Sequence, residues 1–116
     1  MAESIDVAVR RHNEVGIVDV RGYINNVGRE RVAAECDKLI EEGLHRLLIN
    51  LESCTIVNSV GISFLIDIIE RVSELQGQFA FCCVSPTIAK TFQIMGLLQT
   101  ASVYDTEADA LEALAV

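Results

Sequence analysis

Residues 54–75, CTIVNSVGISFLIDIIERVSEL, constrain the fold more than any other part of the chain. The stretch leaves a β-strand and turns directly into the longest apolar helix that the sequence predicts. Asn58 is the expected N-cap, because its side-chain oxygen can accept a hydrogen bond from a free amide of the first turn. Helical spacing then predicts one core-facing stripe, formed by Gly61, Leu65, Ile68, Val72 and Leu75.

A second apolar row makes the hydrophobic face of this helix wider than contact with one sheet requires. Ile62, Ile66 and Ile69 form that row, and Phe64 widens the opposite flank. Either a helix at 85–95 of the same chain covers Ile62 and Ile66, or a partner protein covers them.

The chain length predicts a single domain over residues 1–116, large enough to bury a core without metal or disulfide bonds. Its longest apolar runs are interrupted by Asn50, Glu52 and Asp67, well short of the ~20 residues that a bilayer span needs. The start, MAESIDV, has neither a basic stretch nor an apolar signal core. We therefore expect a cytoplasmic protein without direct membrane insertion.

Charge and cysteine usage argue against several function classes. Nine basic and seventeen acidic residues give a net charge of −8, and the basic residues are scattered, so nucleic-acid binding is not expected. The four cysteines form no CxxC pair, and neither histidine stands at metal-ligand spacing from them. We expect the cysteines to be structural, with no metal and no cofactor.

Alternating segments predict the fold class. Residues 5–10 and 15–24 predict an antiparallel hairpin, and the later strands at 44–51, 78–84 and 101–104 alternate with helices. Those helices are expected at 28–42, from Asn58 to Gln76-Gly77, from Ser85-Pro86 to Gly96, and from Thr106 through Leu114. The order β-β-α-β-α-β-α-β-α indicates an α/β fold with a mixed sheet, mainly parallel at its centre.

No motif indicates catalysis. The chain lacks GxGxxG, a Walker-type phosphate loop and CxxC, so an enzyme is not expected, and nucleotide binding lacks its defining residues. Ser59 is the one polar group placed for a switching role, since phosphate at a helix N-terminus adds up to about two negative charges. Its simpler role is to help start the helix.

With these residues in view, the sequence resembles a STAS domain, the fold of bacterial anti-sigma factor antagonists. The likeness runs almost end to end and includes GYIN at 22–25, LLINLESCTIVNSVGISFL and VSPTIAKTFQIMGL. The recurring motif of that family is Asp-Ser-Ser/Ala-Gly followed by an apolar residue. It stands here as Asn58-Ser59-Val60-Gly61-Ile62.

The resemblance implies a partner-switching mechanism. In that family the antagonist binds an anti-sigma factor, often a serine kinase with a GHKL-type ATP site, and so frees a sigma factor. Phosphorylation just before the glycine breaks the complex, and a PP2C-type phosphatase restores it. Here that position is Val60, which cannot accept phosphate, and the surviving serine, Ser59, lies one residue earlier, rotated by ~100° on the helix.

We therefore predict a non-enzymatic protein-binding module that sequesters an anti-sigma factor and is not switchable at the usual position. The alternative is a STAS subunit of a lipid-transporting ABC system or a signalling scaffold. Ser59 is a candidate phosphorylation site. The predicted contact residues are Tyr23, Asn25, Asn26, Asn58, Ser59, Val60, Gly61, Ile62 and Ile66.

Overall fold

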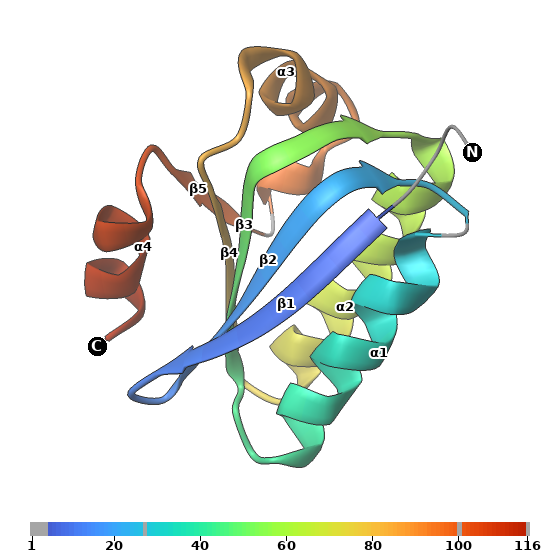
Figure 1. Ribbon diagram of the computed structural model, residues 1–116. Helices are drawn as coiled ribbons and strands as arrows, with labels where there is room; N and C mark the ends of the chain where they lie inside the picture. The colour runs from blue at the N-terminus through green and yellow to red at the C-terminus, as the bar shows by residue number, and fades with distance from the viewer. Residues whose placement is uncertain (1–4, 27, 100, 116) are drawn as a thin grey trace.

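The computed structural model describes residues 5–26, 28–99 and 101–115. Its elements follow the predicted order (Figure 1). They are β1 (Ile5–His12), β2 (Val15–Ile24), α1 (Gly28–Glu41), β3 (Arg46–Val57), α2 (Ser59–Glu74), β4 (Gln78–Cys82), α3 (Pro86–Ile94), the 3-10 turn η1 (Leu97–Gln99), β5 (Ser102–Tyr104) and α4 (Glu107–Leu114).

The five strands form one mixed sheet in the order β1-β2-β3-β4-β5. β1 and β2 pair antiparallel through a tight turn, which confirms the predicted hairpin. The pairs β2–β3, β3–β4 and β4–β5 are parallel. The α/β fold with a mainly parallel centre is therefore confirmed.

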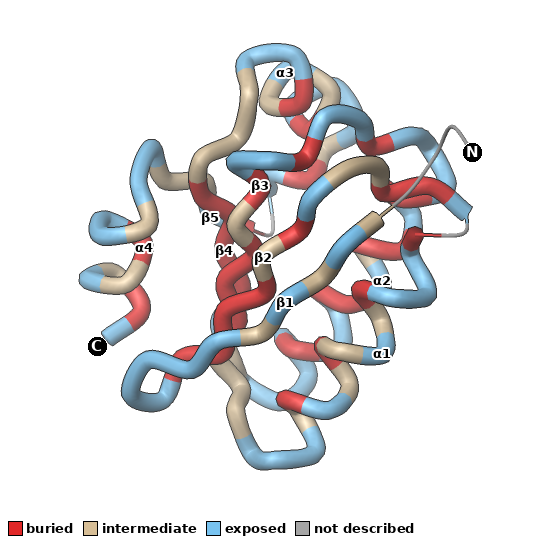
Figure 2. The backbone as a smooth tube through the Cα atoms, viewed as in Figure 1, coloured by how far each residue is buried: buried red, intermediate tan, exposed pale blue. Residues whose placement is uncertain are grey.

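Helices cover both faces of the sheet, and each face has its own core. α1 and α2 lie side by side on one face, while the short α4 lies on the other (Figure 1). Alternation along β2 divides its residues, because Val18 and Val20 join the larger core and Val15 and Ile17 join the smaller core under α4. Figure 2 shows the buried residues concentrated in the central strands and on the inner sides of the helices.

Two apolar residues depart from the predicted helix faces. Helical spacing places Leu75 in the core stripe of α2, and the amphipathic set Ile88, Ala89, Phe92 and Met95 places Met95 on the inner side of α3. Both residues are exposed. Each is the C-cap residue, one position beyond its last helical residue. The helical repeat no longer determines direction there, because the backbone leaves the helix.

β3 is longer than the sequence predicts. The expected strand ended at Leu51, but β3 continues through Val57 and reaches the start of α2. Its extension pairs with the end of β2 after two register shifts. No helix in the described part of the chain is both long and apolar enough to cross a bilayer.

Candidate protein-binding site

The predicted contact residues meet where β2 and β3 end and α2 begins. The two strands are parallel, so their carboxyl ends lie at the same edge of the sheet, with Tyr23 opposite Ile56 and Ile24 opposite Val57. The Asn58 backbone N–H donates to the Ile24 carbonyl oxygen over 3.1 Å. The segment after β2 and the start of α2 therefore form one continuous surface.

Asn58 caps α2 as predicted. Its backbone is extended, with φ −90° and ψ −179°. Its side-chain oxygen accepts a hydrogen bond from the Gly61 N–H over 2.9 Å, and its carbonyl accepts from the Ile62 N–H over 2.9 Å. The cap fixes the direction in which the first turn of α2 leaves the sheet.

Gly61 allows α2 to approach β2 closely. A Cβ at this position would lie 2.9 Å from Ile24 Cγ2 and would also press on the Ile24 carbonyl oxygen. Carbon atoms in favourable contact are about 3.5–4.0 Å apart, so a side chain here would push the helix away from the strand. Gly61 is buried and shapes the site from beneath.

The residues that reach the surface are partly apolar. Ser59 is exposed, and Val60 retains 40% of its accessible surface at the start of α2. Ile56 is 48% exposed at the end of β3 and was missed by the sequence reasoning, which ended that strand at Leu51. An apolar strip at a strand–helix junction is suited to protein contact.

Three predicted contact residues lie below the surface, where they support the site and are not exposed to a partner. Gly61 is the first, because it packs against β2 as described above. Ile62 is fully buried in the same core cluster as Phe92 of α3 and Leu97 of η1. Cover from within the chain therefore accounts for Ile62, while Ile66 is half-buried against the same core.

Asn25 is the third of these buried residues. It is only 7% exposed, and its side-chain oxygen accepts a hydrogen bond from the Gly28 N–H over 2.8 Å. The Asn25 carbonyl also accepts from the Arg29 N–H over 2.8 Å, so this residue starts α1. Tyr23 is half-buried and Asn26 is exposed, so these two stay in the candidate surface.

The site has the means to bind but carries no activated nucleophile or metal cluster among the described residues. Burial raises the pKa of the nearby Cys54 thiol to about 11 and that of the distant Cys36 thiol to about 12. Within residues 5–26, 28–99 and 101–115, no group of three or more His, Cys, Asp or Glu side chains is arranged to hold a metal. The surface offers hydrogen bonds and apolar contact.

A family comparison agrees with this architecture. The STAS domain family matches residues 6–110, and the chain belongs to that family. The chain is 22% identical over 114 residues to an anti-sigma F factor antagonist from Paenibacillus polymyxa, covering 97% of each protein. It is 24% identical over 109 residues to the anti-sigma-F factor antagonist RsfB from Mycobacterium tuberculosis, covering 94% of this chain and 88% of RsfB.

Structural comparison leads to the same group. The chain superimposes on the crystal structure of an anti-sigma factor antagonist from Mycobacterium paratuberculosis with a TM-score of 0.89 and 26% identity. The match covers 100% of this chain and 98% of that one. The fold is thus that of a STAS domain.

Proposed function

We propose that this protein is an anti-sigma factor antagonist that works by binding, without catalysis of its own. It binds an anti-sigma factor in the cytoplasm and thereby releases a sigma factor. The relatives named as antagonists support this function, because they match the chain over nearly its full length. The proposed contact is formed by Tyr23, Asn26, Ile56 and residues 58–60, with half-buried Ile66 at its margin. Buried Asn25, Gly61 and Ile62 support this surface from beneath.

The observation that carries the proposal is the exposed apolar strip at the start of α2. Val60 and Ile56 are exposed although α2 buries almost every other apolar side chain in its first three turns. Asn58 and Ser59 place polar groups beside the strip. Apolar contact at the centre with hydrogen bonds around it is the usual composition of a protein interface.

The proposed partner is an anti-sigma factor with a GHKL-type serine kinase domain, and a PP2C-type phosphatase is the proposed reversing enzyme. Val60 has no hydroxyl, so the complex is not broken by phosphorylation at this position. Ser59 has an exposed hydroxyl but lies one residue earlier, where its direction on the helix differs by ~100°. We propose that the cognate kinase binds this protein without lasting phosphate transfer.

Binding to the cognate anti-sigma kinase, measured by calorimetry with and without ATP, tests the proposal. We expect Val60→Asp to weaken binding at least roughly tenfold, because it puts a charge into an apolar contact. Leu75→Asp is the matched control, since Leu75 is similarly exposed at the opposite end of the same helix. The urea midpoint should change little for Val60→Asp, whose charge lies at the favourable N-terminal end of α2, and should fall slightly for Leu75→Asp at the C-terminal end.

Phosphate transfer is the second readout. With ATP the wild-type complex should persist, whereas Val60→Ser should accept phosphate and dissociate. Phosphorylation of wild-type Ser59 followed by release would refute the unswitchable antagonist. If the protein binds no anti-sigma factor and co-purifies with transport ATPase subunits, the antagonist function is refuted in favour of a role as a subunit of an ABC transport system.

A further inference from the structure

A second apolar surface lies at the end of α3 and the start of η1. Ile94 is 72% exposed, Met95 46% and Leu98 41%, so three of the six large apolar residues exposed in the described part of the chain fall within five positions. The surrounding segment, residues 85–104, contains one charged residue, Lys90. Because 22% of the chain is charged, about four charged residues would be expected among these twenty. Large apolar residues that are exposed close together in this way are typical of a contact surface.

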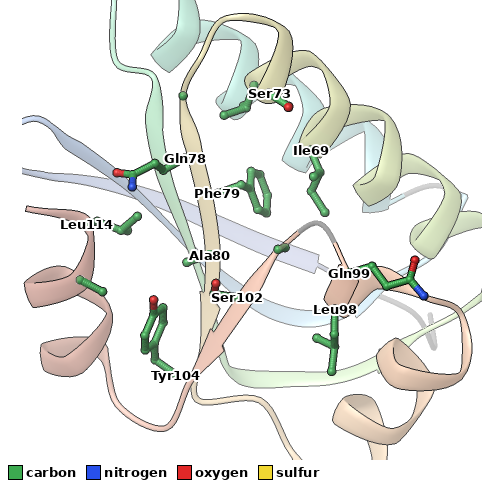
Figure 3. A pocket seen from close by; sticks show the side chains of 14 residues that line it. Ile69, Ser73, Gln78, Phe79, Ala80, Leu98, Gln99, Ser102, Tyr104 and Leu114 are labelled. Carbon is green, nitrogen blue, oxygen red and sulfur yellow. The ribbon is translucent and has the colours of Figure 1, made fainter. Parts of the chain in front are cut away.

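Leu98 connects this surface to a groove of about 350 Å³. Leu98 and Gln99 form one wall, Ile69 and Ser73 of α2 form the other, and Phe79 lies between them (Figure 3). The groove exists because β5 is short. It pairs only with Ala80 to Cys82, so no β5 residue stands beside the first two residues of β4.

Two exposed glutamates of α2, Glu70 and Glu74, lie near the part of the helix that lines the groove. Residues three or four apart are neighbours on a helix, so Glu70 lies beside Ser73, and Glu74 lies beside Glu70. Both carboxylates are exposed. Neither glutamate forms an ion pair within the described residues. Arg71, which lies between them in the sequence, pairs instead with Asp37 of the neighbouring α1.

We propose that this surface binds a basic amphipathic helix of a partner protein. The apolar side of that helix packs on Ile94 and Leu98, and its Lys or Arg side chains lie against Glu70 and Glu74. Lys90 stands one turn before Ile94 on α3, so it fixes the direction: the basic edge of the partner faces α2 and not α3. A helix can lie across such a groove and place side chains from one face into it.

Charge argues against the other occupants. A second copy of the chain would bring the same two glutamates and a net charge of −8 to the contact. An anionic membrane would be repelled by the same carboxylates. On α2 the two surfaces use different parts of the helix, since Ser73 lies thirteen residues after Val60, or ~20 Å along the axis of α2. The inference therefore does not depend on the anti-sigma partner.

The experiment titrates the full chain with a synthetic helical peptide of about four turns, carrying leucines on one face and lysines along one edge. Affinity is read by fluorescence anisotropy at about 0.15 M ionic strength, and the contact is mapped by amide chemical shifts in NMR. We expect the largest shift changes at Ile94, Leu98 and Glu70. Peptides of scrambled order, or with glutamate in place of lysine, should bind at least roughly tenfold more weakly.

Variants of the protein locate the binding energy. The double variant Glu70→Gln/Glu74→Gln should weaken binding of the lysine peptide severalfold to roughly tenfold, and so should the single variant Ile94→Ser. The charge-matched control is Glu30→Gln with Glu41→Gln on α1, whose carboxylates are also exposed and unpaired in the described chain. The apolar control is Ile56→Ser on the other surface. Leu98→Gln provides a second apolar test should Ile94→Ser unfold.

Several outcomes would overturn the proposal. Equal affinity of the glutamate peptide, unchanged affinity of the Glu70/Glu74 variant, or shift changes away from Ile94 and Leu98 would each do so. A dimer that light scattering detects and Ile94→Ser abolishes would assign the surface to a second copy. Sedimentation with phosphatidylcholine–phosphatidylglycerol vesicles that Ile94→Ser abolishes would assign it to a membrane.

Discussion

Gly61→Ala should destabilise the protein although alanine is the better helix former. The new Cβ would lie 2.9 Å from Ile24 Cγ2, so the start of α2 must retreat by about 0.6 Å or more to reach an ordinary contact of about 3.5 Å. Such overpacking costs about 1–3 kcal/mol. The same retreat stretches the 3.1 Å hydrogen bond from the Asn58 N–H to the Ile24 carbonyl, whose loss costs about 1 kcal/mol.

The opposing effect is smaller. Replacing glycine by alanine in a helix favours folding by about 1 kcal/mol, and by less near a helix end. We therefore expect a net loss of about 2 kcal/mol in the free energy of unfolding, measured by urea denaturation. Ser63→Ala, at an exposed position on the same helix, should change it by less than about 0.5 kcal/mol.

A Gly61→Ala protein as stable as the wild type would refute the reasoning, because it would mean that α2 and β2 are not in close contact. Binding adds a second readout. The displaced helix start should weaken anti-sigma binding even at temperatures where the variant is fully folded. Unchanged binding by a destabilised variant would mean that the first turn of α2 does not form the contact.

Two further predictions concern the face under α4 and the buried thiols. Hydrogen bonds from Arg10 and from Asn50 hold the pKa of Glu107 below its ordinary value of 4.5. The ionised Glu107 therefore stabilises the fold above pH 4.5, and this stabilisation is lost as the pH falls from 4.5 through the lower pKa of the folded state. Glu107→Gln should lower the free energy of unfolding by less than about 1 kcal/mol at pH 7, because the Arg10–Glu107 ion pair is partly exposed. The difference in urea midpoint between variant and wild type should vanish in acid, and a difference that persists at low pH would contradict this. The Cys36 and Cys54 thiols should resist Ellman's reagent in the native protein, because burial raises the pKa of each, whereas all four cysteines should react after unfolding. Four fast-reacting thiols in the native state would show that these cores open readily.

Local chemistry in the sequence is sufficient for the order of elements and for most helix starts. Asn58, Ser85 and Thr106 each accept a hydrogen bond from the backbone N–H three residues later, as their side chains and positions predict. Period-two alternation identifies the hairpin, and continuous apolar runs identify the central parallel strands. These features depend on neighbours within a few residues, so the sequence alone contains them.

Residues whose role depends on distant neighbours could not be assigned from the sequence. Asn25 has the chemistry of a surface contact but is buried because α1 starts on it. Ile62 is fully buried in a core to which strands and helices far apart in the sequence contribute. Ile56 reaches the surface because pairing with β2 extends β3 by six residues beyond the predicted strand. Long-range pairing, and not local propensity, decides these positions.

The end of α2 shows the same division within two residues. The sequence Gln76-Gly77 determines that the helix stops there, and glycine would be expected to take the left-handed conformation. Instead Gln76 has φ 61°, and Gly77 N–H donates to the Val72 carbonyl over 2.8 Å. Gly77 is needed as glycine because a Cβ would press on the His45 carbonyl, a contact that exists only once β4 has paired beside β3.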